Sequence, residues 1–439
     1  MTSLARKLHA TDYFTLAFGT MVGVGWLVVM DDWLRRGGPL GAILGFVLGG
    51  AALLPIGYVY GRLVMEMPDA GSEIAYTERV FPREISYWTG WIMTVAYWVV
   101  CPWEAVAIGK IAAYLFPTLN SFELYRVAGK PVYLPQLLIG LALAGMITAM
   151  NYRGIQISAR FQKWTTFGLL ALFALFGSFG VTRGSVQNFR PPFSHSGLVS
   201  ILLVIQIVPY FMTGFESVPK CAEEANPEFR ARGFFITILV ALAAGIFFYA
   251  GAIAVVAFVH PWQPLTHQNF ATAFAFRQAF GREWIVNVIL AAAILSLLKI
   301  FNGNFIASSR LFMALGRRGL IDSRIGRVHE RNRTPANAAL LAGLLTAAGT
   351  FAGEAILIPI TEVGSMASAV GWFATCAAFL AIESNPGRRL VAAVGALVAA
   401  VLLGMKLLPV VPGHFSAAEF AALAIWVAAG FVFRSRPAR

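Results

Sequence analysis

Charged residues are scarce in this chain. Asp, Glu, Lys and Arg make up 13% of its 439 residues, whereas ordinary soluble domains carry roughly 25%. Hydrophobic residues make up 58% of the chain, the mean hydropathy is +0.70, and apolar runs of about 20 residues recur along the whole sequence. This composition excludes an ordinary soluble domain. It predicts an all-α membrane protein that crosses the bilayer many times.

Cysteine is almost absent. The three cysteines, Cys101, Cys221 and Cys376, lie far apart, in or at the edge of apolar runs. They form no CxxC pair and have no cluster of histidines beside them. We therefore predict no disulfide framework, no metal site and no cofactor.

The motifs of enzymes and of nucleic-acid grooves are also missing. The apolar runs contain no HExxH, no Gly-x-Ser-x-Gly and no paired His and Asp, so we expect no enzymatic activity. The net charge is +13, but no basic segment is interleaved with aromatic residues as a nucleic-acid groove would require. The positive charges instead gather in loops that would share one side of the membrane, which is the positive-inside bias.

Twelve membrane spans are predicted. Their even number puts both ends of the chain on one side, and positive residues place that side in the cytoplasm, at the plasma (inner) membrane. The most basic loop, "RRGLIDSRIGRVHERNR" after the eighth span, falls on the same side. The polar start leads into a full-length span, so no cleavable signal peptide is expected. The positive residues at the two ends of the chain are Arg6, Lys7, Arg434, Arg436 and Arg439. The predicted spans are 13–30, 40–65, 86–115, 134–150, 159–182, 198–219, 233–258, 284–315, 336–352, 356–382, 389–408 and 417–434.

The first and the sixth predicted spans contain helix breakers and acidic residues. The first reads "GTMVGVGWLVVMDDWL", and the sixth reads "VPYFMTGFESVPKCAEEANP". The two lie five spans apart, and an odd number of spans per repeat inverts the second copy. This arrangement predicts an inverted 5+5 repeat in one permease domain over 1–439. Its parts are a first repeat at about 10–182, a second at about 198–382, and two additional helices at 389–434.

A helix broken within a membrane exposes unpaired backbone groups, which survive only where they line a cavity or meet a ligand. The half-helix that begins near Gly25 would offer N–H groups to an anion. The half-helix that ends near Met21 would offer carbonyl groups to a cation. The sixth span, around Thr213 and Gly214, would likewise offer both N–H groups and carbonyl groups. An α-amino acid fits both. The alternative is that the glycines only allow close helix packing, and Gly19 and Gly23 do have GxxxG spacing.

Four motifs resemble those of the amino acid–polyamine–organocation (APC) permeases, in the same order and at the same spans. They are "GTMVGVGW", "EMPDAGSEIAYTERVFP", "FMTGFESVPKCAEEANPEFR" and "FNGNFIASSRLFMALGRRGLI". The resemblance covers about residues 10–383. It implies the leucine-transporter-like fold, with broken helices 1 and 6, and amino acid transport by alternating access.

The resemblance also implies a substrate site. The N–H groups of Val24 and Gly25 would hold the substrate carboxylate, and Gly23 and Gly214 lie at the two breaks. The substrate amine would be held by the carbonyls of Met21, Tyr210 and Thr213. Tyr210 would be the aromatic gate above the substrate. Glu216 matches the sixth-span acid of the family. The resemblance also implies that Cys101 and Glu104 from the third span, and Asn302 from the eighth, approach the substrate side chain.

Lys299 is the hypothesised coupling residue. It lies about 15 residues from the outer end of its predicted span, too deep to reach water at 1.5 Å per residue. Proton-coupled relatives often carry a lysine in the fifth span, but that position falls here at Gly168 or Leu169. We hypothesise that Lys299 supplies the missing positive charge from the eighth span. The alternative is a structural ion pair, for example with Glu216 or Glu104.

Asp31 and Asp32 leave two interpretations open. They form either a solvated helix end near Arg35 and Arg36 or an acidic vestibule that attracts cationic substrates. The function predicted from the sequence is secondary active transport of amino acids, by proton symport or exchange. The alternatives are an amine or polyamine carrier of the same fold and a sensor that binds amino acids without transporting them. The sequence leaves open the substrate, the coupling ion, the transport direction and the oligomeric state.

Overall fold

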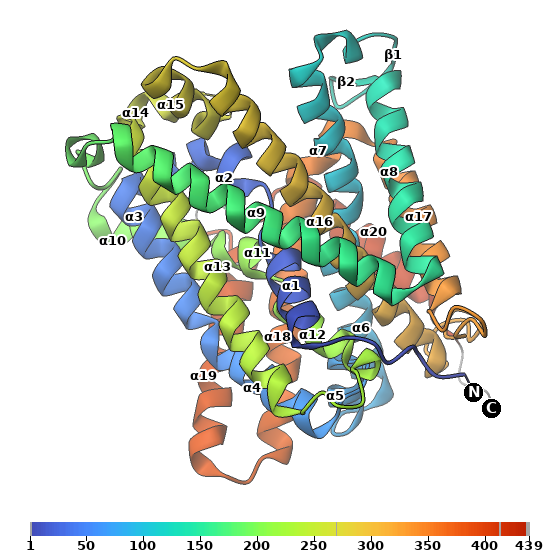
Figure 1. Cartoon of the computed structure of the whole chain (residues 1–439). Helices are drawn as coiled ribbons and strands as arrows, with labels where there is room; N and C mark the ends of the chain where they lie inside the picture. The colour runs from blue at the N-terminus through green and yellow to red at the C-terminus, as the bar shows by residue number, and fades with distance from the viewer. Residues whose placement is uncertain (1, 269, 412–413, 436–439) are drawn as a thin grey trace.

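A computed structural model describes residues 2–268, 270–411 and 414–435. Arg436 and Arg439, which entered the charge argument above, lie outside this range. The described chain is built of α-helices with one short β-hairpin (Figure 1). This confirms the predicted all-helical membrane class, with the hairpin as an unpredicted addition.

Among the described residues, eight helical stretches are long and apolar enough to cross a membrane. They are Met30–Glu66, Arg83–Leu115, Leu134–Arg153, Ile155–Arg183, Arg232–Val259, Glu283–Arg317, Glu362–Ile382 and Pro386–Leu407. Two shorter apolar helices follow the same pattern, Ala336–Thr350 and Ala417–Phe433. Together these stretches overlap every predicted span except the first and the sixth.

The first and sixth predicted spans are interrupted helices. The first consists of α1 (Ala10–Met21) and α2 (Gly25–Val28), which leads into α3 (Met30–Ala52). The sixth consists of α10 (Gly197–Ile205), α11 (Val208–Met212) and α12 (Ser217–Lys220). The helices α1, α2, α10, α11 and α12 are each too short to cross a membrane alone. Neither interrupted region therefore counts among the eight stretches.

The remaining long helices lie where membrane spans are predicted. Within α3 the chain turns sharply at Gly38, whose φ of 62° suits a residue without a side chain, and Pro39 follows it. Asn385 caps α19 by accepting a hydrogen bond from the Arg388 N–H at 3.1 Å. The long helices are α4 (Leu54–Glu66), α6 (Arg83–Trp98), α7 (Val100–Leu115), α8 (Leu134–Arg153), α9 (Ile155–Arg183), α13 (Arg232–Val259), α16 (Glu283–Arg317), α17 (Ala336–Thr350), α18 (Leu357–Ile382), α19 (Pro386–Leu407) and α20 (Ala417–Phe433).

Short elements fill the loops. The loop before α8 contains the antiparallel hairpin of β1 (Glu123–Val127) and β2 (Lys130–Tyr133). The others are α5 (Glu73–Glu78), α14 (Trp262–Leu265), α15 (Ala271–Phe280) and the 3₁₀ turns Pro117–Leu119, Val186–Phe189, Ala222–Glu224 and Gly353–Ile356. The hairpin lies at the end of the molecule away from the two termini (Figure 1).

Helix α1 lies in the middle of the molecule, where it contacts α9, α13 and α16 (Figure 1). Both ends of the described chain contact the basic loop after α16. The Ala5 N–H donates to the Arg333 carbonyl at 3.1 Å, and the Ser435 N–H donates to the Leu320 carbonyl at 3.0 Å. The two ends and this loop therefore lie on one side of the molecule.

Candidate functional site

The two predicted helix breaks touch each other. Gly214, at the break of the sixth predicted span, has a φ of 138°, a conformation that residues with a side chain rarely adopt. A Cβ atom added to Gly214 would lie 2.6 Å from the Met21 nitrogen and 2.8 Å from the Thr20 carbonyl carbon. The break of one span thus packs directly against the backbone of the other, where no side chain would fit.

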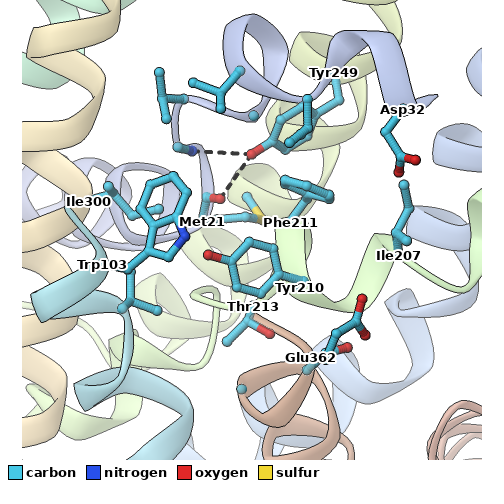
Figure 2. A pocket seen from close by; sticks show the side chains of 18 of the residues that line it. Met21, Asp32, Trp103, Ile207, Tyr210, Phe211, Thr213, Tyr249, Ile300 and Glu362 are labelled. Carbon is cyan, nitrogen blue, oxygen red and sulfur yellow. Dashed lines mark hydrogen bonds between the residues drawn. The ribbon is translucent and has the colours of Figure 1, made fainter. Parts of the chain in front are cut away.

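The carbonyl end of α1 is held by a tyrosine from α13. The Tyr249 hydroxyl donates to the Met21 carbonyl and accepts from the Gly23 N–H, both at 3.2 Å (Figure 2). Tyr249 is fully buried. This single hydroxyl therefore satisfies one backbone group on each side of the gap between α1 and α2.

Three side chains of α16 bind the other carbonyls of this segment. Lys299 donates to the Val22 carbonyl and, at 3.4 Å, to the Gly19 carbonyl. Ser296 donates to the Gly23 carbonyl at 2.9 Å, and Asn304 donates to the Thr20 carbonyl at 3.4 Å. Because the last carbonyls of a helix have no partner within it, these donors are what allows α1 to end inside the protein.

The N–H groups at the start of α2 have no such partners. Within the described part of the chain, the backbone N–H groups of Val24 and Gly25 donate no hydrogen bond. Val24 is 1% exposed, and both residues line a cavity. Buried N–H groups without a partner are rare in proteins, so these two are available to a ligand.

The cavity next to the breaks has a volume of about 390 Å³, a size typical of small-molecule sites. Trp103 and Ile300 lie on one side of it, and Tyr210, Thr213 and Glu362 lie on another (Figure 2). The full lining is Thr20, Met21, Gly23, Val24, Gly25, Val28, Val29, Asp32, Trp33, Arg35, Arg36, Ala96, Val100, Trp103, Glu104, Ile207, Tyr210, Phe211, Thr213, Tyr249, Ile300, Asn304, Glu362, Gly364, Ser365 and Lys406.

Most of the residues named from the sequence lie at this cavity. Those in its lining are Met21, Gly23, Val24, Gly25, Glu104, Tyr210 and Thr213. Gly214 and Glu216 lie behind it at the sixth-span break, while Cys101, Asn302 and Lys299 are buried outside the lining.

Asn302 faces α8 and α9 instead of the cavity. Its side-chain oxygen accepts hydrogen bonds from Ser158 at 2.8 Å and Asn151 at 3.1 Å, and its nitrogen donates to Gln162 at 2.9 Å. These contacts use its hydrogen-bonding capacity. Two residues further along α16, Asn304 reaches the cavity lining, since two residues turn a helix by about 200°.

Glu216 and Cys101 have local partners. One oxygen of Glu216 accepts from the Gly214 N–H at 3.0 Å, and the other accepts from the Trp372 indole at 3.1 Å. The carboxylate therefore fixes the sixth-span break and does not point into the cavity. The Cys101 thiol donates to the Tyr97 carbonyl at 3.8 Å within its own turn.

Several lining residues were not anticipated from the sequence. Phe211 and Asn304 lie inside two of the motifs quoted above but had no assigned role, and Tyr249 and Ser365 are single polar residues in apolar helices that no motif distinguishes. One signal was available for α16, where Ser296 and Lys299 are three residues apart and so share one face of the helix. For Tyr249 the sequence offers no such pattern.

Asp32 lines the cavity and also forms ion pairs. It accepts from Arg36 at 2.6 Å and is bonded to Arg35. Across the cavity, Glu362 of α18 pairs with Lys406 of α19. Asp31 is not part of the lining. Asp32 is therefore paired with arginine and also lines the cavity, and the attraction of cationic substrates stays a prediction.

Two buried ion pairs lie around the second half of the sixth span, where the Glu224 carbonyl accepts hydrogen bonds from the Lys7 and Leu8 N–H groups. Lys220 of α12 bonds to Glu73 of α5 at 2.6 Å, and Arg310 of α16 bonds to Glu224 at 2.8 Å. All four side chains have 0% exposure. The Tyr60 hydroxyl also donates to Glu73 at 2.8 Å. These contacts tie the second half of the sixth span to the helices around it.

Replacing Tyr249 by Phe tests the bridging hydroxyl. Without it the buried Gly23 N–H has no partner, which costs about 1–3 kcal/mol. We expect Tyr249→Phe to lower the melting temperature in detergent and to raise the KM of uptake about 10-fold. Tyr114→Phe, at an exposed tyrosine of α7, is the control and should change neither value. An unaltered KM in Tyr249→Phe would contradict this role for the hydroxyl.

Comparison with known proteins identifies the family of this chain. The family model described as "Amino acid permease" matches residues 8–432. The chain belongs to this family. Amino acid permeases are transport proteins, so the predictions of a permease and of a protein that is not an enzyme are confirmed.

Individual permeases are similar over most of their length. The methylthioribose transporter of Bacillus subtilis is 26% identical over 379 residues, covering 83% of this chain and 79% of the relative. The branched-chain amino acid permease BcaP of the same organism is 23% identical, with 87% and 80% covered. The aromatic amino acid transport protein AroP of Escherichia coli K12 is 23% identical, with 78% and 73% covered.

Proposed function

We propose that this permease is a secondary active transporter that carries amino acids across the plasma membrane by alternating access. The observation that carries the proposal is the contact between two helix breaks beside a cavity, with the N–H groups of Val24 and Gly25 unpaired. Backbone groups in this arrangement suit a ligand that carries both an anionic and a cationic group. Relatives named as carriers of aromatic and branched-chain amino acids support this substrate class.

The proposed substrate spans the two breaks. The N–H groups of Val24 and Gly25 bind its carboxylate, and the carbonyls of Met21, Tyr210 and Thr213 bind its ammonium. The Met21 carbonyl accepts one bond from Tyr249 and keeps a second lone pair for the ligand. The Tyr210 ring covers the substrate from the outer side, and Gly23 and Gly214 allow the close approach.

The finer fold belongs to the same proposal. We propose twelve spans in an inverted 5+5 repeat (about 10–182 and 198–382) followed by helices at 389–434, with both termini in the cytoplasm. The interrupted first and sixth spans support the repeat. The contacts of both chain ends with the basic loop after α16 support the shared side.

In this mechanism the cavity is loaded from the outer side and later opens toward the cytoplasm. The partly exposed lining residues Asp32 and Arg36 lie where this open end meets water. The buried pairs Lys220–Glu73 and Arg310–Glu224 hold the inner side shut. A change that separates these pairs would release the substrate inward.

Lys299 is the proposed coupling residue. Its ammonium donates to the Val22 and Gly19 carbonyls at the end of α1, so its charge lies at the negative end of a half-helix. It makes no salt bridge within the described chain, which argues against a structural ion pair with Glu104 or Glu216. Loss of its proton would weaken the tie between α1 and α16, and this links protonation to the movement of the first span.

Lys299→Met tests this coupling. We expect the variant to lose uptake driven by a pH gradient while keeping part of its exchange activity, because exchange needs no net proton movement. The measurement is uptake into proteoliposomes with and without an imposed gradient. Lys163→Met, which removes a lysine that is 37% exposed and paired with Asp12, is the matched control. An unchanged pH dependence in Lys299→Met would refute the coupling role.

Uptake of a panel of labelled amino acids and amines into proteoliposomes tests the function itself. Saturable, carboxylate-dependent uptake supports the proposal. Uptake of amines without a carboxylate would indicate an amine or polyamine carrier of the same fold. Binding without any uptake would indicate a sensor.

A further inference from the structure

Glu104 is a buried acid in the cavity wall. It lies on α7, is 1% exposed, and lines the cavity next to Trp103. Its Oε2 atom is inaccessible to solvent and has no hydrogen-bond partner in the described part of the chain. A buried carboxylate normally has partners for its oxygens, so this one requires an explanation.

The other charges of the cavity are accounted for. Asp32 pairs with Arg35 and Arg36, and Glu362 pairs with Lys406. Among the acids that line the cavity, Glu104 is the one that makes no salt bridge to a described residue.

Lys299 of α16 is also buried, but it makes no ion pair with Glu104 in the described part of the chain. The Lys299 ammonium bonds to the carbonyls of α1. Lys299 is therefore held by the first span and leaves the carboxylate of Glu104 without a direct partner.

The surroundings of Glu104 make an apolar ligand unsuitable. The apolar side chains of Val100, Trp103 and Ile300 line the same cavity as Glu104. A neutral substrate side chain would leave Glu104 without a counter-charge, and the buried carboxyl group would then have to take up a proton. A positively charged group placed there would form a buried ion pair, and the neighbouring indole could contact it through its ring face.

We infer that Glu104 is a specificity-determining residue that binds a cationic group at the end of the substrate side chain. The substrate class is then amino acids that carry an ammonium or a guanidinium, as lysine and arginine do. This inference rests on the proposed function, because the backbone of the two breaks must take the α-carboxylate and α-ammonium. With those two groups bound by the backbone, Glu104 is available to the side chain of the substrate.

The test compares four labelled substrates in proteoliposomes: L-lysine, L-arginine, L-leucine and L-phenylalanine. We expect the wild-type protein to take up the two cationic amino acids with a kcat/KM at least about 10-fold above the neutral two. Glu104→Gln should lower the values for lysine and arginine about 10- to 100-fold and leave those for leucine and phenylalanine unchanged or higher. Glu104→Asp should restore part of the cationic preference.

Glu283→Gln is the matched control, because Glu283 is an exposed acid at the start of α16, and it should leave all ratios unchanged. A thermal shift of wild-type protein by lysine but not by leucine is the second readout and does not depend on a variant that folds. Equal loss for all four substrates in Glu104→Gln, or a wild-type preference for the neutral pair, would overturn the inference while the transport function stands. Failure to transport any amino acid would overturn both.

Discussion

Glu73→Ala is expected to destabilise the protein by about 3–5 kcal/mol, because it leaves the ammonium of Lys220 buried without a counter-charge. Both side chains have 0% exposure and their atoms lie 2.6 Å apart. The Lys220 ammonium also donates to the Glu216 carbonyl at 2.9 Å and lies 4.7 Å from the centre of the Tyr97 ring. Neither contact replaces the lost negative charge. The measurement is thermal or denaturant unfolding of the purified protein in detergent.

Two controls separate burial from charge. The double variant Glu73→Gln with Lys220→Met removes both charges and should recover most of the lost stability. Asp322→Ala removes an exposed acid whose pKa is lowered to about 2, chiefly by hydrogen bonds from the Arg324 side chain. Because exposed pairs contribute little, it should leave the melting temperature within error. Equal effects of Glu73→Ala and Asp322→Ala would contradict the buried-pair interpretation.

Gly214→Ala is expected to abolish substrate uptake with a smaller effect on expression. The added Cβ would lie 2.6 Å from the Met21 nitrogen, and the φ of 138° disfavours any side chain. The backbone of the first-span break must then move away from the sixth-span break. A displacement of about 1 Å in a binding geometry can reduce activity about 100-fold. The measurement is the kcat/KM of uptake in proteoliposomes at matched protein incorporation.

Gly145→Ala and Gly177→Ala are the matched controls. They make the same substitution in membrane helices α8 and α9, where an added Cβ meets nothing within 4 Å. Both should transport at the wild-type rate. Retention of wild-type uptake by Gly214→Ala would show that contact between the breaks is not needed for binding.

The sequence predicted the backbone of the site better than its side chains. The breaks at Gly23 and Gly214 were predicted because glycine and proline interrupt helices locally. Such interruptions can be read from a short stretch of sequence. Long apolar runs likewise placed the spans. The β-hairpin at 123–133 and α5 were not predicted, since short elements in loops are determined by contacts with the rest of the fold.

The side chains depended on information that is not local. Asn302 and Asn304 lie two residues apart, and only the rotation of α16 against its neighbours decides that the second faces the cavity. Glu73 and Lys220 are 147 positions apart, so no spacing in the sequence reveals the pair. Tyr249 is one aromatic residue among many in an apolar helix, and its role follows only from its contact with Gly23 and Met21.

Competition between an amino acid and its decarboxylated amine tests the central claim most directly, because the claim assigns the carboxylate to the free N–H groups of Val24 and Gly25. Uptake of labelled L-lysine or L-leucine into proteoliposomes would be measured against unlabelled L-lysine and cadaverine, or against L-leucine and 3-methylbutylamine. Two charge-assisted hydrogen bonds of about 1.5–3 kcal/mol each predict that the amine competes at least about 100-fold more weakly than the amino acid. Equal competition by the amine would contradict a site built on the backbone of the broken first span.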